Sequence, residues 1–307
     1  MKIETMKRRP KIRITLLIAA LLTAAFSFVI PNDAEDVKRE LFWSRKTFAR
    51  PVYDVLLLGD SRLYRGLSPE AMKPHLPGLK ILNFGYSNGG LNPTMFEAAE
   101  EKLAENNKPK VIVLGISANT VTGYSADNQH YLQEVNRPRE QLIERMYFHP
   151  LRQWFPSTSP RKLLQLFAEN KDSSFYRHTY HKSGYVASEK FPIDTTEAIP
   201  LYTDDFRNYK VEEKFLEPLF RQVEEWSNEG ITVVAFRPPV SQPMRELENT
   251  MGRFDEQHIK NEINRAGGYW IELNPSEYKT YDGSHLTIES ARKLSVKVAN
   301  SISELIQ

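Results

Sequence analysis

The sequence predicts an α/β domain of three layers, built on a parallel sheet of five strands with a long insertion. Short apolar runs bounded by turn residues alternate with segments of helical periodicity, which is typical of strand–helix–strand crossovers. The first run, Val55-Leu56-Leu57-Leu58, leads directly into Gly59-Asp60-Ser61. A run of this kind indicates a strand buried on both faces of a parallel sheet. Helices would then cover both faces.

The composition is that of a globular protein with few constraints on its partners. The chain has 307 residues, 40% of them apolar and 26% charged, which is enough for one large domain or two small ones. A formal net charge of +2 gives no case for nucleic acid as a partner. The chain contains no cysteine, which excludes disulfides, a thiol nucleophile, cysteine-ligated metal and a lipobox anchor.

The amino terminus predicts a membrane anchor. Residues 1–13 are basic, and residues 14–30 are uncharged and largely aliphatic up to Pro31. Seventeen residues lie at the short end of the length that spans a bilayer. The basic flank should stay in the cytoplasm, which places the rest of the chain outside, beyond a polar stalk or a short amphipathic helix at 31–50. A signal peptide cleaved near Thr23-Ala24-Ala25 and a buried core helix are the alternatives.

The remaining elements of the domain, expected over residues 51–307, follow in order. Ser68 and Pro69 mark the start of a short helix, as N-cap and first helical residue. Later strands are expected at residues 80–84, 111–115, 231–236 and 269–273. Further helices are expected at 92–106, 211–228, 243–266 and after Thr287. From about 120 to 210 the alternation is lost, and this tract is expected to be an insertion over the sheet with helices near 137–147 and 160–169.

Ser61 is the first candidate for chemistry. It follows a glycine at the carboxyl end of a buried strand, where open α/β sheets carry their functional groups. Asp282 and His285 lie three residues apart in a loop before the last helix. This spacing lets the carboxylate accept a hydrogen bond from one ring nitrogen and leaves the other nitrogen to face a serine. A plain surface turn is the alternative for each motif alone.

The order of these motifs resembles that of the SGNH/GDSL hydrolase family from about residue 52 to 305. The motifs are Gly59-Asp60-Ser61, Asn83-Phe84-Gly85 and Asp282-Gly283-Ser284-His285. The resemblance implies a flavodoxin-like fold in which Ser61 is the nucleophile and Asp282 and His285 complete a catalytic triad. It also implies that the backbone N–H groups of Ser61 and Gly85 bind the oxyanion.

The third family motif departs from the expected pattern. An asparagine would normally stand two residues after Gly115, but Ser117 stands there and Asn119 lies two residues further on. Either side chain could supply the remaining oxyanion donor. The departure resembles membrane-anchored relatives that act on cell-surface polymers, such as alginate O-acetylation proteins and the teichoic-acid D-alanylation protein.

Residues that could bind substrate lie in the insertion and after the fourth strand. Tyr176, His178 and Tyr180 would form an aromatic and cationic wall for a sugar or acyl ligand. Arg237 could reach the carboxyl edge of the sheet, with a plain surface arginine as the alternative. No metal site is expected, because the histidines near 178 lack further ligands at suitable spacing.

The resulting expectation is a serine-dependent esterase or O-acyltransferase without cofactor, anchored in the membrane and facing outward. Its substrate would be an acylated small molecule, carbohydrate or cell-envelope polymer, and a membrane-bound acyl-transfer protein is a possible partner. Two alternatives are a non-catalytic glycan-binding member of a polysaccharide modification or export assembly, and a scaffold whose insertion recruits membrane proteins.

Overall fold

The computed structural model describes residues 14–21, 36–37, 39–145 and 175–306. The chain divides into two compact units, residues 1–35 with 138–169 and residues 36–137 with 170–307. In the first unit, residues 14–21 are helical and α7 (Arg139–Ile143) lies within the helix predicted near 137–147. None of the described helices is long and apolar enough to cross a membrane. Residues 22–30 of the predicted anchor and the helix expected at 160–169 lie outside the described residues.

The second unit contains the predicted sheet. Its strands are β2 (Val55–Leu58), β3 (Ile81–Asn83), β4 (Val111–Gly115), β7 (Thr232–Phe236) and β8 (Tyr269–Trp270). They lie in the order β3-β2-β4-β7-β8, and every neighbouring pair is parallel. The prediction of five parallel strands is therefore confirmed. The order reverses between β2 and β4, which is the point where doubly wound sheets bind ligands.

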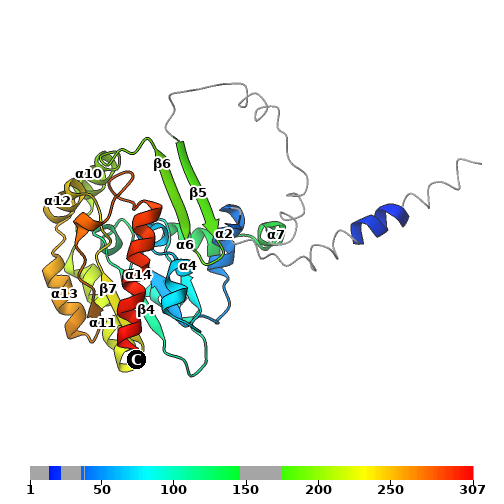
Figure 1. Ribbon diagram of the computed structural model, residues 1–307, viewed down its shortest axis with the longest axis horizontal. Coiled ribbons are helices and arrows are strands. Elements are labelled where there is room, and N and C mark those ends of the chain that lie inside the picture. Colours follow the sequence, from blue (N-terminus) through cyan, green and yellow to red (C-terminus); the bar gives the residue numbers. More distant parts are fainter. Residues whose placement is uncertain (1–13, 22–35, 38, 146–174, 307) are drawn as a thin grey trace, which may run out of the picture. The chain divides into compact units, whose positions relative to one another are not determined.

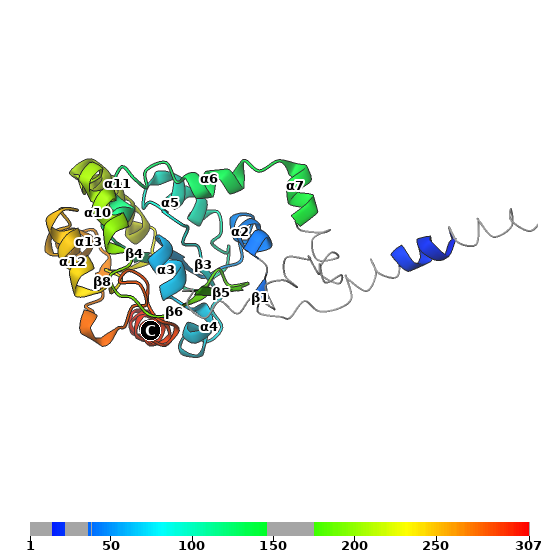
Figure 2. The same cartoon turned by 90° about the horizontal axis from the view of Figure 1, so that it is seen from above.

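Helices cover both faces of this sheet. Leu56 and Leu58 of β2 pack into one apolar cluster, whereas Val55 and Leu57 pack into another, because successive side chains of a strand point to opposite faces. Figure 2 shows α4 and α14 on one side of the sheet and α5 and α11 on the other. The helices that follow β2 are α3 (Ser61–Gly66), α4 (Pro69–Met72), α5 (Pro93–Glu100), α6 (Gln129–Val135), α10 (Ile199–Asn208), α11 (Glu213–Asn228), α12 (Gln242–Thr250), α13 (Glu256–Arg265) and α14 (Ile288–Leu305).

The helix expected at 243–266 is two helices, α12 and α13. The break lies at Gly252 and Arg253, and Arg253 has a φ of 57°. A Cβ atom on Gly252 would lie 2.6 Å from the carbonyl oxygen of Glu248, so this close turn requires glycine. The spacing of apolar residues continues through the break, and the sequence therefore predicts one helix where the structure has two.

The segment predicted as a stalk at 31–50 contributes to the core. Residues 39–47 form α2 (Arg39–Thr47), in which Phe42 and Trp43 are only 2% and 8% exposed. Both belong to the same apolar cluster as Leu56 and Leu58. The domain therefore begins before residue 51, and α2 is the short helix leading into the domain that was predicted as the alternative to a stalk.

The insertion contains a β-hairpin that the sequence did not predict. β5 (Phe175–His181) and β6 (Val186–Phe191) pair antiparallel (Figure 1). β5 also pairs with β1 (Asp36–Val37). At the hairpin turn, the carbonyl of Ser183 accepts a hydrogen bond of 2.8 Å from the N–H of Asn83 in β3. The hairpin is thus attached to the central sheet beside the strand that leads to Gly85.

Candidate active site

Ser61 is held at a tight corner at the carboxyl end of β2. Gly59 has a φ of 155°, and a Cβ atom there would lie 2.9 Å from the carbonyl oxygen of Gly115, so a side chain would not fit. Asp60 caps α3, its Oδ1 accepting a hydrogen bond of 2.9 Å from the N–H of Arg62. The helix consequently begins at Ser61, whose side chain is partly exposed.

Ser61, His285 and Asp282 form a continuous hydrogen-bonded series. Ser61 Oγ lies 2.8 Å from His285 Nε2, and His285 Nδ1 lies 2.7 Å from Asp282 Oδ2. Asp282 Oδ1 accepts hydrogen bonds from the backbone N–H groups of Ser284 and His285, at 2.9 and 2.7 Å. The geometry therefore brings together three residues singled out in the sequence, in the order that proton transfer away from the serine requires.

The surroundings set the protonation states of the acid and the base. Burial raises the pKa of Asp282, but hydrogen bonds and the nearby His285 outweigh it and hold the pKa at about 2. Burial and the charge of Arg65 lower the pKa of His285, although Asp282 opposes them. At neutral pH the aspartate is therefore ionised and the imidazole is predominantly neutral, so that Nε2 can accept a proton from Ser61.

Tyr281 and Arg65 fix the histidine from the side. The rings of Tyr281 and His285 are stacked, with centroids 5.8 Å apart and an interplanar angle of 16°. The Arg65 guanidinium donates a hydrogen bond of 3.0 Å to the Tyr281 hydroxyl. Arg65 lies one turn after Ser61 on α3, so the same helix that carries the serine supports the ring beside its base.

Two of the predicted oxyanion donors, the N–H of Gly85 and the side chain of Ser117, are engaged within the protein. A Cβ atom on Gly85 would lie 3.2 Å from the carbonyl oxygens of Gly59 and Asp60, so Gly85 lies against the corner that carries Ser61. The N–H of Gly85 donates to Asn83 Oδ1 at 3.2 Å, the long end of the normal range. Ser117 Oγ donates to Asp60 Oδ2 at 2.7 Å and therefore supports the corner instead of pointing to a free site.

Asn119, the alternative to Ser117, faces a different group. Burial raises the pKa of Asp205 in α10, and a side-chain hydrogen bond from Asn119 partly offsets the rise. The other amide atom, Asn119 Oδ1, is buried without a hydrogen-bond partner among the described residues. Neither candidate for the third donor is therefore directed to an open position beside Ser61.

Of the three hairpin residues expected to line a ligand site, two approach the triad loop. The Tyr176 ring lies 6.2 Å from the Tyr281 ring, and its side chain is 44% exposed. Burial and the charges of Arg65, Arg39 and His285 lower the pKa of His178 to about 4. Tyr180 is partly buried and packs instead against Phe42 of α2, with centroids 5.1 Å apart, at the edge of the core.

Arg237, predicted as a substrate residue, is buried, and its guanidinium is engaged in ion pairs within the protein. It is 3% exposed, and its guanidinium pairs with Glu248 at 2.7 Å and with Glu256 at 3.0 Å. Both acids lie on the helices after β7, so Arg237 joins α12 and α13 to the end of the sheet. The burial of Arg237 excludes the alternative of a plain surface arginine, and contact of Arg237 with a substrate stays a prediction.

The sequence reasoning missed a buried ion network behind Ser61. Arg62 pairs with Glu248, which also pairs with Arg237, and Arg62 Nε donates to Ser284 Oγ at 3.0 Å. Burial raises the pKa of Glu248, but the two guanidinium groups lower that pKa by more than burial raises it. The carboxylate is therefore ionised. A signal existed, because Glu248 lies four residues after Met244, on the buried face of α12.

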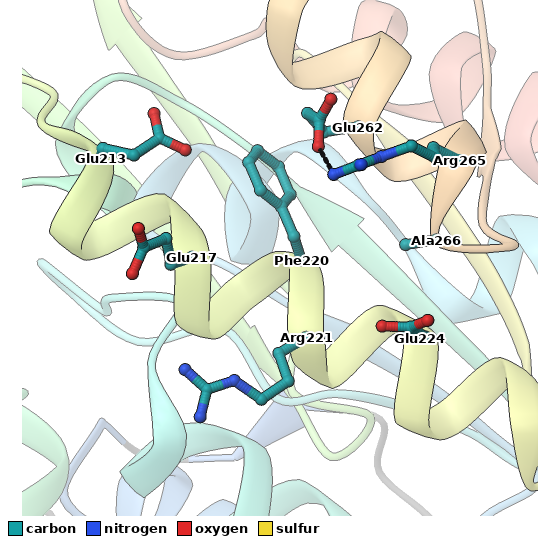
Figure 3. Close-up of a pocket in the computed structure, with 8 residues that line it drawn as sticks. All are labelled: Glu213, Glu217, Phe220, Arg221, Glu224, Glu262, Arg265 and Ala266. Carbon is teal, nitrogen blue, oxygen red and sulfur yellow. Dashed lines mark hydrogen bonds and ion pairs between the residues drawn. The ribbon is translucent and has the colours of Figure 1, made fainter.

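The hollow between α11 and α13 does not coincide with the candidate site, whereas Arg237 lines another hollow of about 540 Å³. The first of these hollows has a volume of about 530 Å³, and Figure 3 shows that its walls are mainly glutamates and arginines around Phe220. No residue predicted from the sequence to be functional lines it. Within the described ranges, no group of three or more His, Asp or Glu residues could hold a metal ion.

Comparisons with known proteins give a weak structural likeness and no match of sequence. No protein-family model matches the chain, and no curated protein matches it. One solved structure, described as "a putative platelet activating factor from Streptococcus pneumonia", matches with a TM-score of 0.33 and 13% sequence identity. The match covers 94% of this chain and 98% of that one. A likeness of this size carries no conclusion about activity.

The ion network yields a prediction about stability. Glu248→Gln leaves two buried guanidinium groups without their shared counterion, and breaking a buried pair in this way costs about 3–5 kcal/mol. We expect a loss of that order in the free energy of unfolding, measured by urea denaturation. Glu246→Gln, on the exposed face of the same helix, should change it by less than about 0.5 kcal/mol. Equal effects of the two substitutions would contradict the network.

Proposed function

We propose that this protein is a serine-dependent ester hydrolase or acyltransferase that works through an acyl-enzyme. The observation that carries the proposal is the series Ser61 Oγ–His285 Nε2 at 2.8 Å and His285 Nδ1–Asp282 Oδ2 at 2.7 Å. A partly exposed serine, a largely neutral imidazole and an ionised carboxylate in this order are what nucleophilic attack on an ester requires.

In the first step, Ser61 Oγ attacks the acyl carbon while His285 Nε2 takes the hydroxyl proton. Asp282 stays ionised and stabilises the imidazolium. The tetrahedral intermediate then collapses, and the leaving alcohol takes the proton from Nε2, which leaves the acyl group on Ser61. In the second step, water or an acceptor hydroxyl attacks the acyl group, again with His285 as base. Water as the attacking group gives an esterase, and an acceptor hydroxyl gives a transferase.

Two backbone donors are assigned to the oxyanion, the N–H groups of Ser61 and Gly85. Gly85 lies against the Ser61 corner, and its bond to Asn83 Oδ1 is long enough at 3.2 Å to be exchanged for a bond to substrate. Ser117 and Asn119 are left out, because both side chains are engaged elsewhere. Each missing donor typically costs on the order of a hundredfold in rate, so we expect modest turnover.

The proposed substrate is an acylated carbohydrate or cell-envelope polymer. The exposed ring of Tyr176 beside the triad loop offers an apolar face of the kind on which a sugar ring can stack. The predicted N-terminal anchor would place the domain at the outer face of the membrane, where such polymers lie. Tyr176 and His178 are the residues that we assign to this contact.

A second candidate function is glycan binding without turnover. The observation in its favour is that the N–H of Gly85 and the hydroxyl of Ser117 both have partners within the protein. Binding of acetylated oligosaccharide that persists in the Ser61→Ala protein, with no hydrolysis by either protein, would favour this candidate over the esterase.

The nucleophile assignment can be tested with a labelled fluorophosphonate, which reacts covalently with activated serines. We expect the protein to be labelled and the Ser61→Ala variant not, with aryl acetate hydrolysis falling on the order of a thousandfold or more. Ser276→Ala, which removes an exposed serine far along the chain, serves as the matched control and should be labelled like the wild type. Equal labelling of all three proteins would refute the assignment.

The pH dependence follows from the lowered pKa of His285. Only the neutral imidazole can take the serine proton, so kcat/KM should rise with pH. The midpoint of this rise should lie below the ordinary pKa of histidine, and kcat/KM should then stay level near neutrality. Arg65→Met removes a positive charge that disfavours the imidazolium, and should move this rise to higher pH. If kcat/KM of the wild type rose with a midpoint above the ordinary pKa of histidine, this result would contradict the assignment of His285 as base.

A further inference from the structure

Lys46 is a buried lysine with an unusual set of partners. It lies in α2 and is 2% exposed. In the described part of the chain no carboxylate forms an ion pair with it, and its ammonium group donates a hydrogen bond of 2.7 Å to the carbonyl oxygen of Gly85. Long side chains of this type are almost never fully buried without a charged partner, so this arrangement calls for an explanation.

Aromatic rings surround the Lys46 nitrogen. The ring centroids lie 4.7 to 5.3 Å from Nζ, within the range of cation–π attraction, and belong to Phe42, Trp43, Tyr64 and Tyr86. Tyr64 lies in the helix that starts at Ser61, and Tyr86 directly follows Gly85. The cage therefore holds the amine against the two segments that meet at the proposed oxyanion site.

The backbone around Gly85 is held on several sides. The N–H of Phe84 donates to Leu57 at 2.8 Å, and the N–H of Tyr86 donates to Gly59 at 3.0 Å. Gly85 is buried, and Lys46 is the donor that satisfies its carbonyl oxygen. Without that donor the carbonyl would be a buried, unsatisfied acceptor, and the peptide between Gly85 and Tyr86 would tend to rotate.

We propose that Lys46 is a positioning residue for the oxyanion site. By binding the Gly85 carbonyl it fixes the peptide that follows Gly85, and through the torsions at the Gly85 Cα it restrains the preceding peptide, which carries the Gly85 N–H beside Ser61. This inference rests on the proposed function for its catalytic consequence, but the effect on the backbone does not. Burial lowers the pKa of Lys46 well below its ordinary value, yet charged and neutral amines both donate hydrogen bonds.

A role in stability alone gives a different expectation for a simple substitution. Lys46→Met removes the buried amine and leaves the Gly85 carbonyl without its donor, which by itself lowers the melting temperature. A purely structural role would therefore lower the melting temperature and leave kcat of the folded protein unchanged. Arg45→Met is the matched control, because Arg45 is an exposed cation on the same helix.

The experiment compares the wild type, Lys46→Met and Arg45→Met as full-length proteins. For p-nitrophenyl acetate we expect kcat of Lys46→Met to fall about tenfold to a hundredfold, with KM within about twofold, because the lost interaction acts in the transition state. Hydrogen exchange followed by mass spectrometry should show the amides of residues 85–86 exchanging at least about tenfold faster. Arg45→Met should match the wild type in both measurements.

The outcomes separate this inference from the proposed function. Unchanged exchange at residues 85–86 in Lys46→Met would overturn the inference, as would faster exchange with unchanged kcat in an active enzyme. If the wild type hydrolyses no ester, the proposed function fails, and the exchange data still decide whether Lys46 holds the loop. Should Lys46→Met fail to fold, Lys46→Gln, whose shorter side chain does not reach Gly85, is expected to show the same changes.

Discussion

The arrangement of the candidate site depends on the carboxylate of Glu248. This buried group pairs with Arg62, which directly follows Ser61, and with Arg237, which follows β7. Arg62 in turn binds Ser284, the neighbour of His285. One carboxylate thus supports both the helix that carries Ser61 and the loop that carries His285, two residues that lie 224 positions apart in sequence. Such a charge is tolerated in the interior because two guanidinium groups pair with it.

Lys46 makes a comparable buried contact at Gly85. Lys46 donates a hydrogen bond to a backbone carbonyl, whereas Glu248 pairs with two guanidinium groups. Each contact connects a segment of the site to a helix outside the central sheet. The hairpin adds a third support, since its turn binds the backbone of Asn83. Segments that the sheet alone would leave as loops are therefore held by buried polar contacts, which suits a site that must keep its geometry during catalysis.

The sequence predicted the features that depend on local patterns. Strands buried on both faces must be continuous apolar runs, so β2 and β4 were found at nearly their observed positions. Ser61 was found because a glycine corner after such a strand has few alternatives. Asp282 and His285 were found together because their contact spans only three residues, and their assembly with Ser61 agrees with the geometry while their catalytic role stays a prediction.

Features that depend on distant partners could not be predicted. Arg237 directly follows a strand, as a ligand-binding arginine would. Only the position of Glu248 in space shows that Arg237 forms an internal ion pair. The hairpin was missed because β6 buries the polar residues Ser188 and Lys190. The strand therefore lacks the alternation of apolar and polar residues by which a half-buried strand is predicted. Lys46 follows Trp43 on a helix that has the composition of a polar stalk, and its aromatic cage comes from three separate elements.

The central claim is that Ser61 carries an acyl group during turnover. Mass spectrometry of the intact protein, quenched with acid during reaction with an aryl acetate and then digested, tests it directly. The account predicts an acetyl adduct on the peptide that contains Ser61, formed with the first release of phenol and absent from the Ser61→Ala protein. Release of phenol at the same rate from both proteins, with no adduct on that peptide, would contradict it.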